Sequence, residues 1–138
     1  MKQELKNKLA FLADKYEVAE FIMDDPIQFP HRYTGKADIE ISALVASWIA
    51  TGNRKAIIKS GDRIDRELFS NAPYRYILSE EWKKYRGVKT SFYRYYSWND
   101  FYLLCQALYA AYQEYEDLES HLCHSLSWGT PLERLQSV

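Results

Sequence analysis

Apolar residues recur every three or four positions along almost the whole chain, which is the spacing that gathers side chains on one face of an α-helix. In residues 2–16 the apolar face lies opposite lysines and glutamates, so we predict an amphipathic helix whose apolar stripe is Leu5, Leu9, Leu12 and Tyr16. Residues 18–23 form a short apolar segment. Residues 24–37 contain two prolines, which disfavour helix at the positions before them, and are predicted to form an ordered loop.

The middle of the chain predicts two longer helices. Asp38 is expected to cap the first and Gly52 to end it, and its apolar positions are Ile41, Leu44, Val45, Trp48 and Ile49. Asn53 can cap the second helix in the same way. The buried face of that helix would hold Ile57, Ile58, Gly61, Ile64 and Leu68.

Two short helices follow before the helical period is lost. The first covers residues 74–78 after Pro73, a residue that suits the first turn of a helix, and the second covers residues 79–85. Residues 87–90 are typical of a turn. Residues 91–96 are either extended or a single helical turn, and the pattern does not decide between the two.

The helical period returns at Ser97, which with Asp100 resembles a capping box. The long helix that follows has its apolar face at Phe101, Leu104, Leu108, Ala111 and Tyr115. A further helix is marked by Leu118, Leu122 and Leu126. Residues 130–133 carry strong helix-start residues, including Pro131, yet the sequence stops at Val138, so we expect a truncated last helix.

These elements predict an all-α protein, built as a single bundle of roughly six to eight helices with no sheet. A chain of 138 residues suits one domain and buries about two-thirds of the surface exposed by its unfolded form. The domain is expected to span residues 1–138. The incomplete last helix suggests the amino-terminal part of a longer protein.

Charge and composition limit the function classes. The net charge is −1, so no overall field attracts nucleic acid or a membrane, and any basic binding surface must be local. No run approaches the roughly 20 apolar residues of a membrane span, and no apolar signal segment precedes the charged residues 2–8. Cys105 and Cys123 are too far apart for a short metal-binding pair. Two free thiols indicate a cytoplasmic protein.

The loop at residues 24–33 brings several ionisable residues close together in sequence: Asp24, Asp25, His31 and Arg32, followed by Asp38 and Glu40. Carboxylates beside a histidine can bind a cation or share a proton. The alternative, which we favour, is a rigid connection whose charges are solvated or cap the flanking helices. We expect Arg32 to pair with Asp38 or Glu40, because these carboxylates are nearest in sequence.

A second group, His121, Cys123 and His124, has ligand types that zinc uses, and Asp117 lies one helical turn before it. The sequence offers no obvious fourth ligand. The five glycines are isolated, so no phosphate-binding glycine loop exists, and no serine nucleophile motif is present. The sequence therefore predicts no metal site and no cofactor, and it identifies no catalytic residue.

Residues 82–96 contain five cationic and six aromatic residues and no acidic one. Cations can neutralise phosphates and flat rings can stack on bases, so we take the cations as candidate nucleic-acid contacts: Lys83, Lys84, Arg86, Lys89 and Arg94. The alternative is ordinary packing, with the rings in the core and the cations in solvent. In that case the acidic run at residues 114–119 neutralises the cations.

Several short motifs carry a resemblance to an uncharacterised bacterial family of conserved hypothetical proteins, a domain of unknown function. The motifs are Asp25-Pro26, Phe29-Pro30-His31-Arg32-Tyr33, Asp38-Ile39-Glu40-Ile41, Gly52-Asn53-Arg54, Ile57-Ile58 and Tyr93-Arg94-Tyr95 followed by Asp100. The chain resembles only the amino-terminal portion of the longer members. The later half of those members is similar to helix-hairpin-helix DNA glycosylases, whose hairpin and catalytic Asp have no counterpart here.

The resemblance implies DNA repair for a complete member and assigns no catalytic residue to this chain. Two functions remain open. The first is a nucleic-acid-binding helical module related to base-excision repair proteins, with DNA as partner. The second is a structural or protein-interaction domain that binds a second copy, or a carboxy-terminal segment docked on the last helix. Metal-dependent hydrolysis at the loop of residues 24–33 ranks below both.

Overall fold

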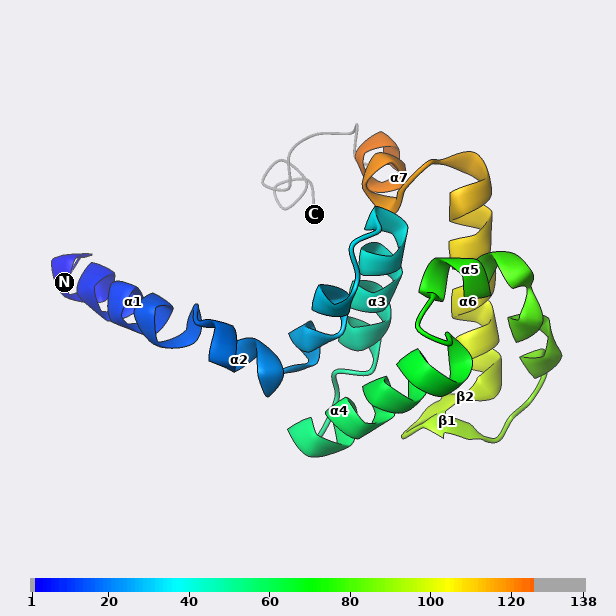
Figure 1. Cartoon of the computed structure of the whole chain (residues 1–138), viewed down its shortest axis with the longest axis horizontal. Helices are drawn as coiled ribbons and strands as arrows, with labels where there is room; N and C mark the ends of the chain where they lie inside the picture. The colour runs from blue at the N-terminus through cyan, green and yellow to red at the C-terminus, as the bar shows by residue number, and fades with distance from the viewer. Residues whose placement is uncertain (1, 126–138) are drawn as a thin grey trace, which may run out of the picture.

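The computed structural model describes residues 2–125, and these are predominantly helical, as predicted (Figure 1). The α-helices are α1 (Lys2–Tyr16), α2 (Ala19–Met23), α3 (Lys36–Trp48), α4 (Arg54–Arg63), α5 (Pro73–Ser79), α6 (Trp98–Glu114) and α7 (Leu118–Ser125). Short 3-10 helices are η1 (Pro26–Gln28), η2 (Pro30–Arg32) and η4 (Glu81–Tyr85), and η3 (Ile64–Leu68) is a π-helical extension of α4. Two short strands are β1 (Ser91–Tyr93) and β2 (Tyr96–Ser97).

The core forms around α6, which packs against α5, η4 and the two strands. Its most deeply buried side chains include Ile41, Ile49, Ile77, Trp82 and Phe101. Burying one such side chain contributes about 1.5–3 kcal/mol. The Trp82 indole N–H donates to the Ile77 carbonyl at 2.9 Å, so this ring is buried without leaving its polar atom unsatisfied.

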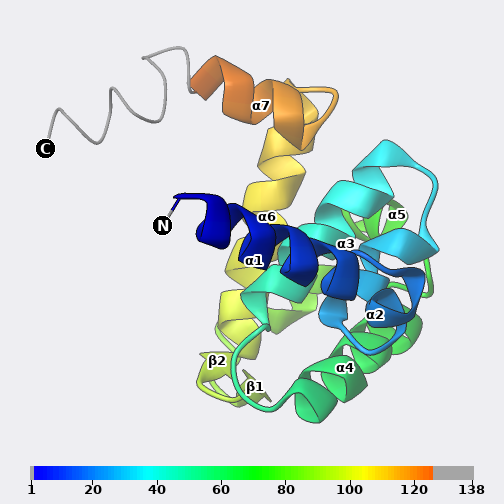
Figure 2. The same cartoon turned by 90° about the vertical axis from the view of Figure 1, so that its left-hand side faces the viewer.

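Helix α1 has the predicted bounds but not the expected burial. None of its residues is buried, and Leu5 and Leu9 are 57% and 55% exposed. Figure 1 shows α1 extending away from the body of the molecule, and in Figure 2, turned by 90°, α1 lies in front of it. The helix contacts the rest of the chain at its carboxyl end, where the Tyr16 and Phe21 rings lie 5.6 Å apart.

Helix α3 begins at Lys36, so the prediction that Asp38 caps it is wrong. Gly35 occupies the cap position, and Asp38 lies in the first turn. Its carboxylate accepts a hydrogen bond from the backbone N–H of Tyr74 at 2.9 Å, at the start of α5. Asp38 therefore satisfies a free N–H at the beginning of another helix, which local spacing could not indicate.

Helix α4 begins as predicted, because the Asn53 side chain accepts the backbone N–H of Lys55 at 2.9 Å. On its inner face Ile57, Gly61 and Ile64 are buried. The helix then widens into the π-helical turn η3. That turn places the carboxylate-bearing Asp65, which is only 3% exposed, in the interior.

Residues 91–97 take the extended alternative and form a small antiparallel hairpin, in place of the predicted absence of any sheet. Arg94 at its tip has a left-handed backbone conformation with a φ of 53°. The next helix starts with the predicted capping box, in which Ser97 and Asp100 each accept from the other's backbone N–H. Residues 74–78 and 79–85 appear as α5 and η4.

The predicted helix start at residues 130–133, the apolar position Leu126 and the expected truncated last helix lie outside the described residues. Cys105 is buried and Cys123 is exposed, and both are free thiols. Between residues 2 and 125 no helix combines the length and apolar character needed to cross a membrane.

Candidate functional site

The motif loop of residues 25–33 is fastened to α4 and η3 by Arg32. Its guanidinium lies 3.1 Å from a carboxylate oxygen of Asp65 and 2.8 Å from one of Asp62. It also donates to the Gln28 side-chain oxygen at 2.7 Å and stacks over the Phe29 ring. The prediction that Arg32 pairs with Asp38 or Glu40 is therefore wrong, although the fixing role expected for the guanidinium is present.

Asp65 is the buried end of this network. The Tyr33 hydroxyl donates to its second oxygen at 2.7 Å. Burial raises the pKa of the Asp65 carboxyl above its ordinary value, and the hydrogen bond from Tyr33 and the charge of Arg32 oppose that rise. Burial, followed by the bond to Asp65, also raises the pKa of Tyr33. These contacts join residues more than 30 positions apart in the sequence. They therefore hold the motif loop against η3.

The other residues of the loop lie apart from this network. Asp25 caps η1 by accepting the Ile27 N–H at 3.0 Å, and its other oxygen lies 3.8 Å from the Arg54 guanidinium. His31 is exposed and does not join the neighbouring carboxylates. No group of three histidine, cysteine, aspartate or glutamate side chains within residues 2–125 is arranged to hold a metal ion.

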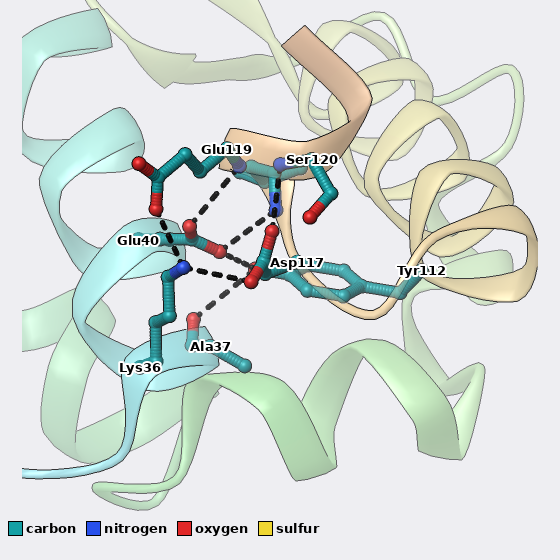
Figure 3. Close-up of polar contacts among 8 residues, drawn as sticks. Lys36, Ala37, Glu40, Tyr112, Asp117, Glu119 and Ser120 are labelled. Atoms are coloured by element: carbon teal, nitrogen blue, oxygen red, sulfur yellow. Dashed lines mark hydrogen bonds and ion pairs between the residues drawn. The ribbon is translucent and has the colours of Figure 1, made fainter. Parts of the chain in front are cut away.

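Glu40 holds α7 against α3. Its carboxylate accepts the backbone N–H groups of Leu118 and Glu119 at 2.9 and 3.2 Å, and the Tyr112 hydroxyl at 2.9 Å (Figure 3). The free N–H groups at the start of α7 thus find their acceptor on a helix almost 80 residues earlier. No spacing rule links Glu40 to α7, so sequence reasoning missed this role.

Lys36 completes the contact between α3 and α7. Its ammonium lies 2.7 Å from Asp117 and 2.6 Å from Glu119 (Figure 3). The acidic run at residues 114–119 is therefore partly neutralised by Lys36, and not by the basic segment as the packing alternative supposed. The hydrogen bond from Lys36, followed by those from Ser120, lowers the pKa of Asp117 to about 2.

This contact predicts a titration that can be measured directly. In Lys36→Met the pKa of Asp117 should rise from about 2 toward its ordinary 3.8, because the largest cause of the shift is removed. A lowered folded-state pKa means that Asp117 stabilises the fold above pH 4 and loses that contribution as pH falls toward 2. The carboxyl carbon signal of Asp117, followed by NMR against pH, measures the shift. An unchanged midpoint would contradict the role of Lys36. The Asp100 carboxyl, whose pKa is lowered mainly by Ser97 and not by Lys36, serves as an internal control.

The five candidate nucleic-acid contacts are all exposed: Lys83, Lys84, Arg86, Lys89 and Arg94. Lys83 forms an ion pair with Glu80 at 2.7 Å. No ion pair within residues 2–125 involves any of the other four. Hydrogen bonds from Ser97 and, more weakly, the charge of Lys89 lower the pKa of Asp100.

Most rings of the basic segment are core residues, as the packing alternative expected. Trp82, Phe92 and Tyr93 are buried, whereas Tyr95 is 67% exposed. Tyr95 follows Arg94 at the hairpin tip and lies against the Tyr96 ring, with centroids 4.9 Å apart. Arg94 and Tyr95 are therefore an exposed cation and an exposed ring at adjacent positions of the hairpin.

The hairpin tip docks on the loop between α3 and α4, which unites two of the family motifs. The Tyr93 hydroxyl donates to the Thr51 carbonyl at 3.0 Å, and the Arg94 guanidinium lies directly over Gly52. Gly52 has a φ of 110°, and a Cβ there would overlap the guanidinium. Gly52-Asn53-Arg54 and Tyr93-Arg94-Tyr95 are thus neighbours in space, which their separation in sequence could not predict.

A surface groove of about 440 Å³ opens beside the same loop. Its walls are mostly apolar and come from the motif loop, α3 and the start of α4, with Pro26, Ile27, Pro30, Ala46 and Ile57 among them. Asp25 and Arg54 supply its charged groups. The motif residues therefore enclose a shallow apolar groove with a cation beside it.

Comparisons with known proteins agree with the motif resemblance. No curated protein and no solved structure matches the chain. The family described as "Protein of unknown function (DUF2400)" matches residues 25–137, which is most of the sequence and includes the motif loop, the hairpin and α7. The chain therefore belongs to the DUF2400 family.

Proposed function

We propose that this chain is a nucleic-acid-binding module that contacts the phosphate backbone through the exposed cations of residues 84–94. The observation that carries the proposal is the hairpin tip, where the Arg94 guanidinium and the exposed Tyr95 ring lie side by side in sequence. A cation for a phosphate and a ring for a base are the two elements of sequence-tolerant binding to a single strand.

The state of the cations supports this function. Arg86, Lys89 and Arg94 are exposed, and within residues 2–125 none of them forms an ion pair. A phosphate that binds these cations therefore would not have to displace an ion-paired carboxylate. Lys83 is engaged by Glu80, so its contribution is the weakest of the five.

DNA is the proposed nucleic acid, because the motif resemblance implies that the longer members are related to DNA glycosylases. No residue between 2 and 125 is assigned a chemical step, since the buried carboxylate Asp65 is held by Arg32 and Tyr33. The proposed role of the module is to bind and position DNA.

Binding should be weak, tolerant of sequence and strongly dependent on salt. Replacing Arg86 and Arg94 together by Gln should weaken binding to a labelled single-stranded oligonucleotide about tenfold or more at low salt. It should also reduce the slope of log K against log salt by roughly 1.5, because two phosphate contacts are lost. Gln removes the charge and keeps a shorter polar side chain, and circular dichroism of the variant verifies that the fold is kept. Fluorescence anisotropy across a salt series measures both quantities.

The matched control is Arg63→Gln with Arg66→Gln, which removes the same charge from exposed positions of α4 and η3. The control should change the slope by less than half as much. Equal effects of the two double variants would mean that only net charge matters. No binding by the wild type at micromolar protein would remove the proposal for this chain.

A further inference from the structure

Three helices of the body leave an apolar groove between them. Two adjoining hollows of about 570 and 240 Å³ share Leu44, Leu118 and Leu122 as lining residues. Leu44 on α3 is 39% exposed and Leu122 on α7 is 55% exposed. Leucine side chains that line a hollow and remain this exposed indicate a surface that binds another protein segment.

The lining residues follow helical stripes. From α3 they are Glu40, Ala43, Leu44 and Ser47, and from α6 they are Leu104, Ala107, Leu108 and Ala111. Each set has the spacing i, i+3, i+4, i+7, so each helix turns one face to the groove. Several of these residues are small, which allows another helix to approach closely. A groove with these walls fits an amphipathic helix.

Helix α1 is amphipathic, and the rest of residues 2–125 does not bury its apolar face. Its stripe of Leu5, Leu9 and Leu12 is not buried. At about 1.5 Å per residue its 15 residues span about 22 Å, against about 20 Å for α3. The length and the apolar face of α1 therefore match the groove.

The charges of the two surfaces are also complementary. Helix α1 carries four lysines and two acidic residues. The groove is edged by Glu40 and Glu119, and the acidic run at residues 114–119 lies at the junction of α6 and α7. Lys36 neutralises only part of this charge. A basic helix is therefore favoured over an acidic one as the occupant.

Local contacts direct α1 away from its own groove. The Tyr16 ring packs edge-on against Phe21 of α2, and Phe21 lies under the Arg54 guanidinium at 5.7 Å. These contacts hold the α1–α2 segment near the start of α4, and α1 projects outward (Figure 1). To reach its own groove α1 would have to give up these contacts, whereas a second copy can accept it unchanged.

We propose that α1 of one copy docks in the α3–α6–α7 groove of a second copy, and that the two copies exchange these helices reciprocally. The exchange is isologous, so one apolar contact is made twice around a two-fold axis. It buries the exposed leucines of both surfaces and places the lysines of α1 beside the acidic edge.

Sedimentation velocity on residues 1–138 tests the exchange. The wild type should pass from monomer to dimer as its concentration rises through the micromolar range, and less readily at high salt. Leu5→Glu with Leu9→Glu should weaken association at least about tenfold, because charges would enter an apolar contact. The matched control is Phe11→Glu, which adds a charge to another face of α1 and should leave the dimer intact.

The groove is tested separately by Leu44→Glu and by Ala107→Glu, both at exposed positions, with far-ultraviolet circular dichroism to verify folding. Either change should also prevent dimerisation. An equimolar mixture of the Leu5/Leu9 variant with a groove variant should regain a dimer, because one intact helix–groove pair remains. A wild type that stays monomeric overturns the proposal in favour of fold-back or another partner. A dimer that survives the Leu5 and Leu9 changes overturns it as well.

Discussion

Replacing Arg32 by Ala should lower the free energy of unfolding by about 3 kcal/mol at pH 7. The change leaves the Asp65 carboxyl group buried without the guanidinium that lies 3.1 Å from it. Breaking a buried ion pair by removing one partner costs roughly 3–5 kcal/mol. We take the lower end, because the Arg32 side chain is 31% exposed and water screens part of its charge.

The loss of stability caused by Arg32→Ala should become smaller as the pH falls. Burial raises the pKa of Asp65 above its unfolded value, so its ionisation opposes folding, and protonation at low pH removes that opposition. Without Arg32 the pKa rises further. The destabilisation by Arg32→Ala should therefore be largest at high pH and shrink as pH falls and Asp65 becomes protonated, because a neutral Asp65 needs no cation.

Urea unfolding of both proteins at pH 4.5, 7 and 8 measures this effect, with Arg63→Ala as control. Arg63 is an exposed arginine that faces Glu67 at 4.0 Å, and its removal should cost no more than about 0.5 kcal/mol at any pH. Arg32→Lys should recover less than half of the loss, since one ammonium cannot reach Asp62 and Asp65 as the fork does. A loss independent of pH would contradict the charge interaction with Asp65.

The helices could be predicted because their signals lie within one or two turns. The bounds of α1, the Asn53 cap of α4 and the capping box of Ser97 with Asp100 all depend on residues at most four apart or on a short apolar period. The family resemblance was also readable from short motifs. None of these features needs knowledge of how the helices pack.

The errors arise where a residue contacts a distant part of the chain. Arg32 pairs with carboxylates 30 and 33 positions later, and Asp38 serves α5 instead of its own helix. The periodicity of α1 correctly predicted its apolar face but could not tell whether that face is covered within the same molecule. Local pattern specifies which face of a helix is apolar, and only the packing decides what meets it.

The candidate site, like the fold, was predictable only where its signals are local in the sequence. The motif residues Arg32, Asp38 and Glu40 bind separate helices to one another. Their role in the structure is therefore to stabilise the packing of the helices. The exposure of Arg94 and Tyr95 depends on the hairpin that docks on Gly52, which the sequence left undecided between extended and helical forms. Composition alone suggested the basic segment, and the structure separates its exposed cations from its buried rings.

The motif loop should depend equally on Gly61. A Cβ at this position would overlap the ring of Phe29, which is buried and cannot swing aside. Overpacking of this kind costs roughly 1–3 kcal/mol, and we expect the upper end because the contact lies between a helix backbone and a fixed ring. Ala is favoured over Gly within a helix by about 1 kcal/mol, which offsets part of the cost.

Gly61→Ala should therefore destabilise the protein by about 2 kcal/mol in urea unfolding, against the gain expected from helix propensity alone. Ala56→Gly, at an exposed position of α4, measures the propensity term on the same helix and should cost about 1 kcal/mol. In the double variant Phe29→Leu with Gly61→Ala the shorter side chain makes room for the new methyl group. Its loss should fall short of the sum of the two single losses by at least about 1 kcal/mol. Additive losses would mean that Phe29 does not hold the motif loop against Gly61.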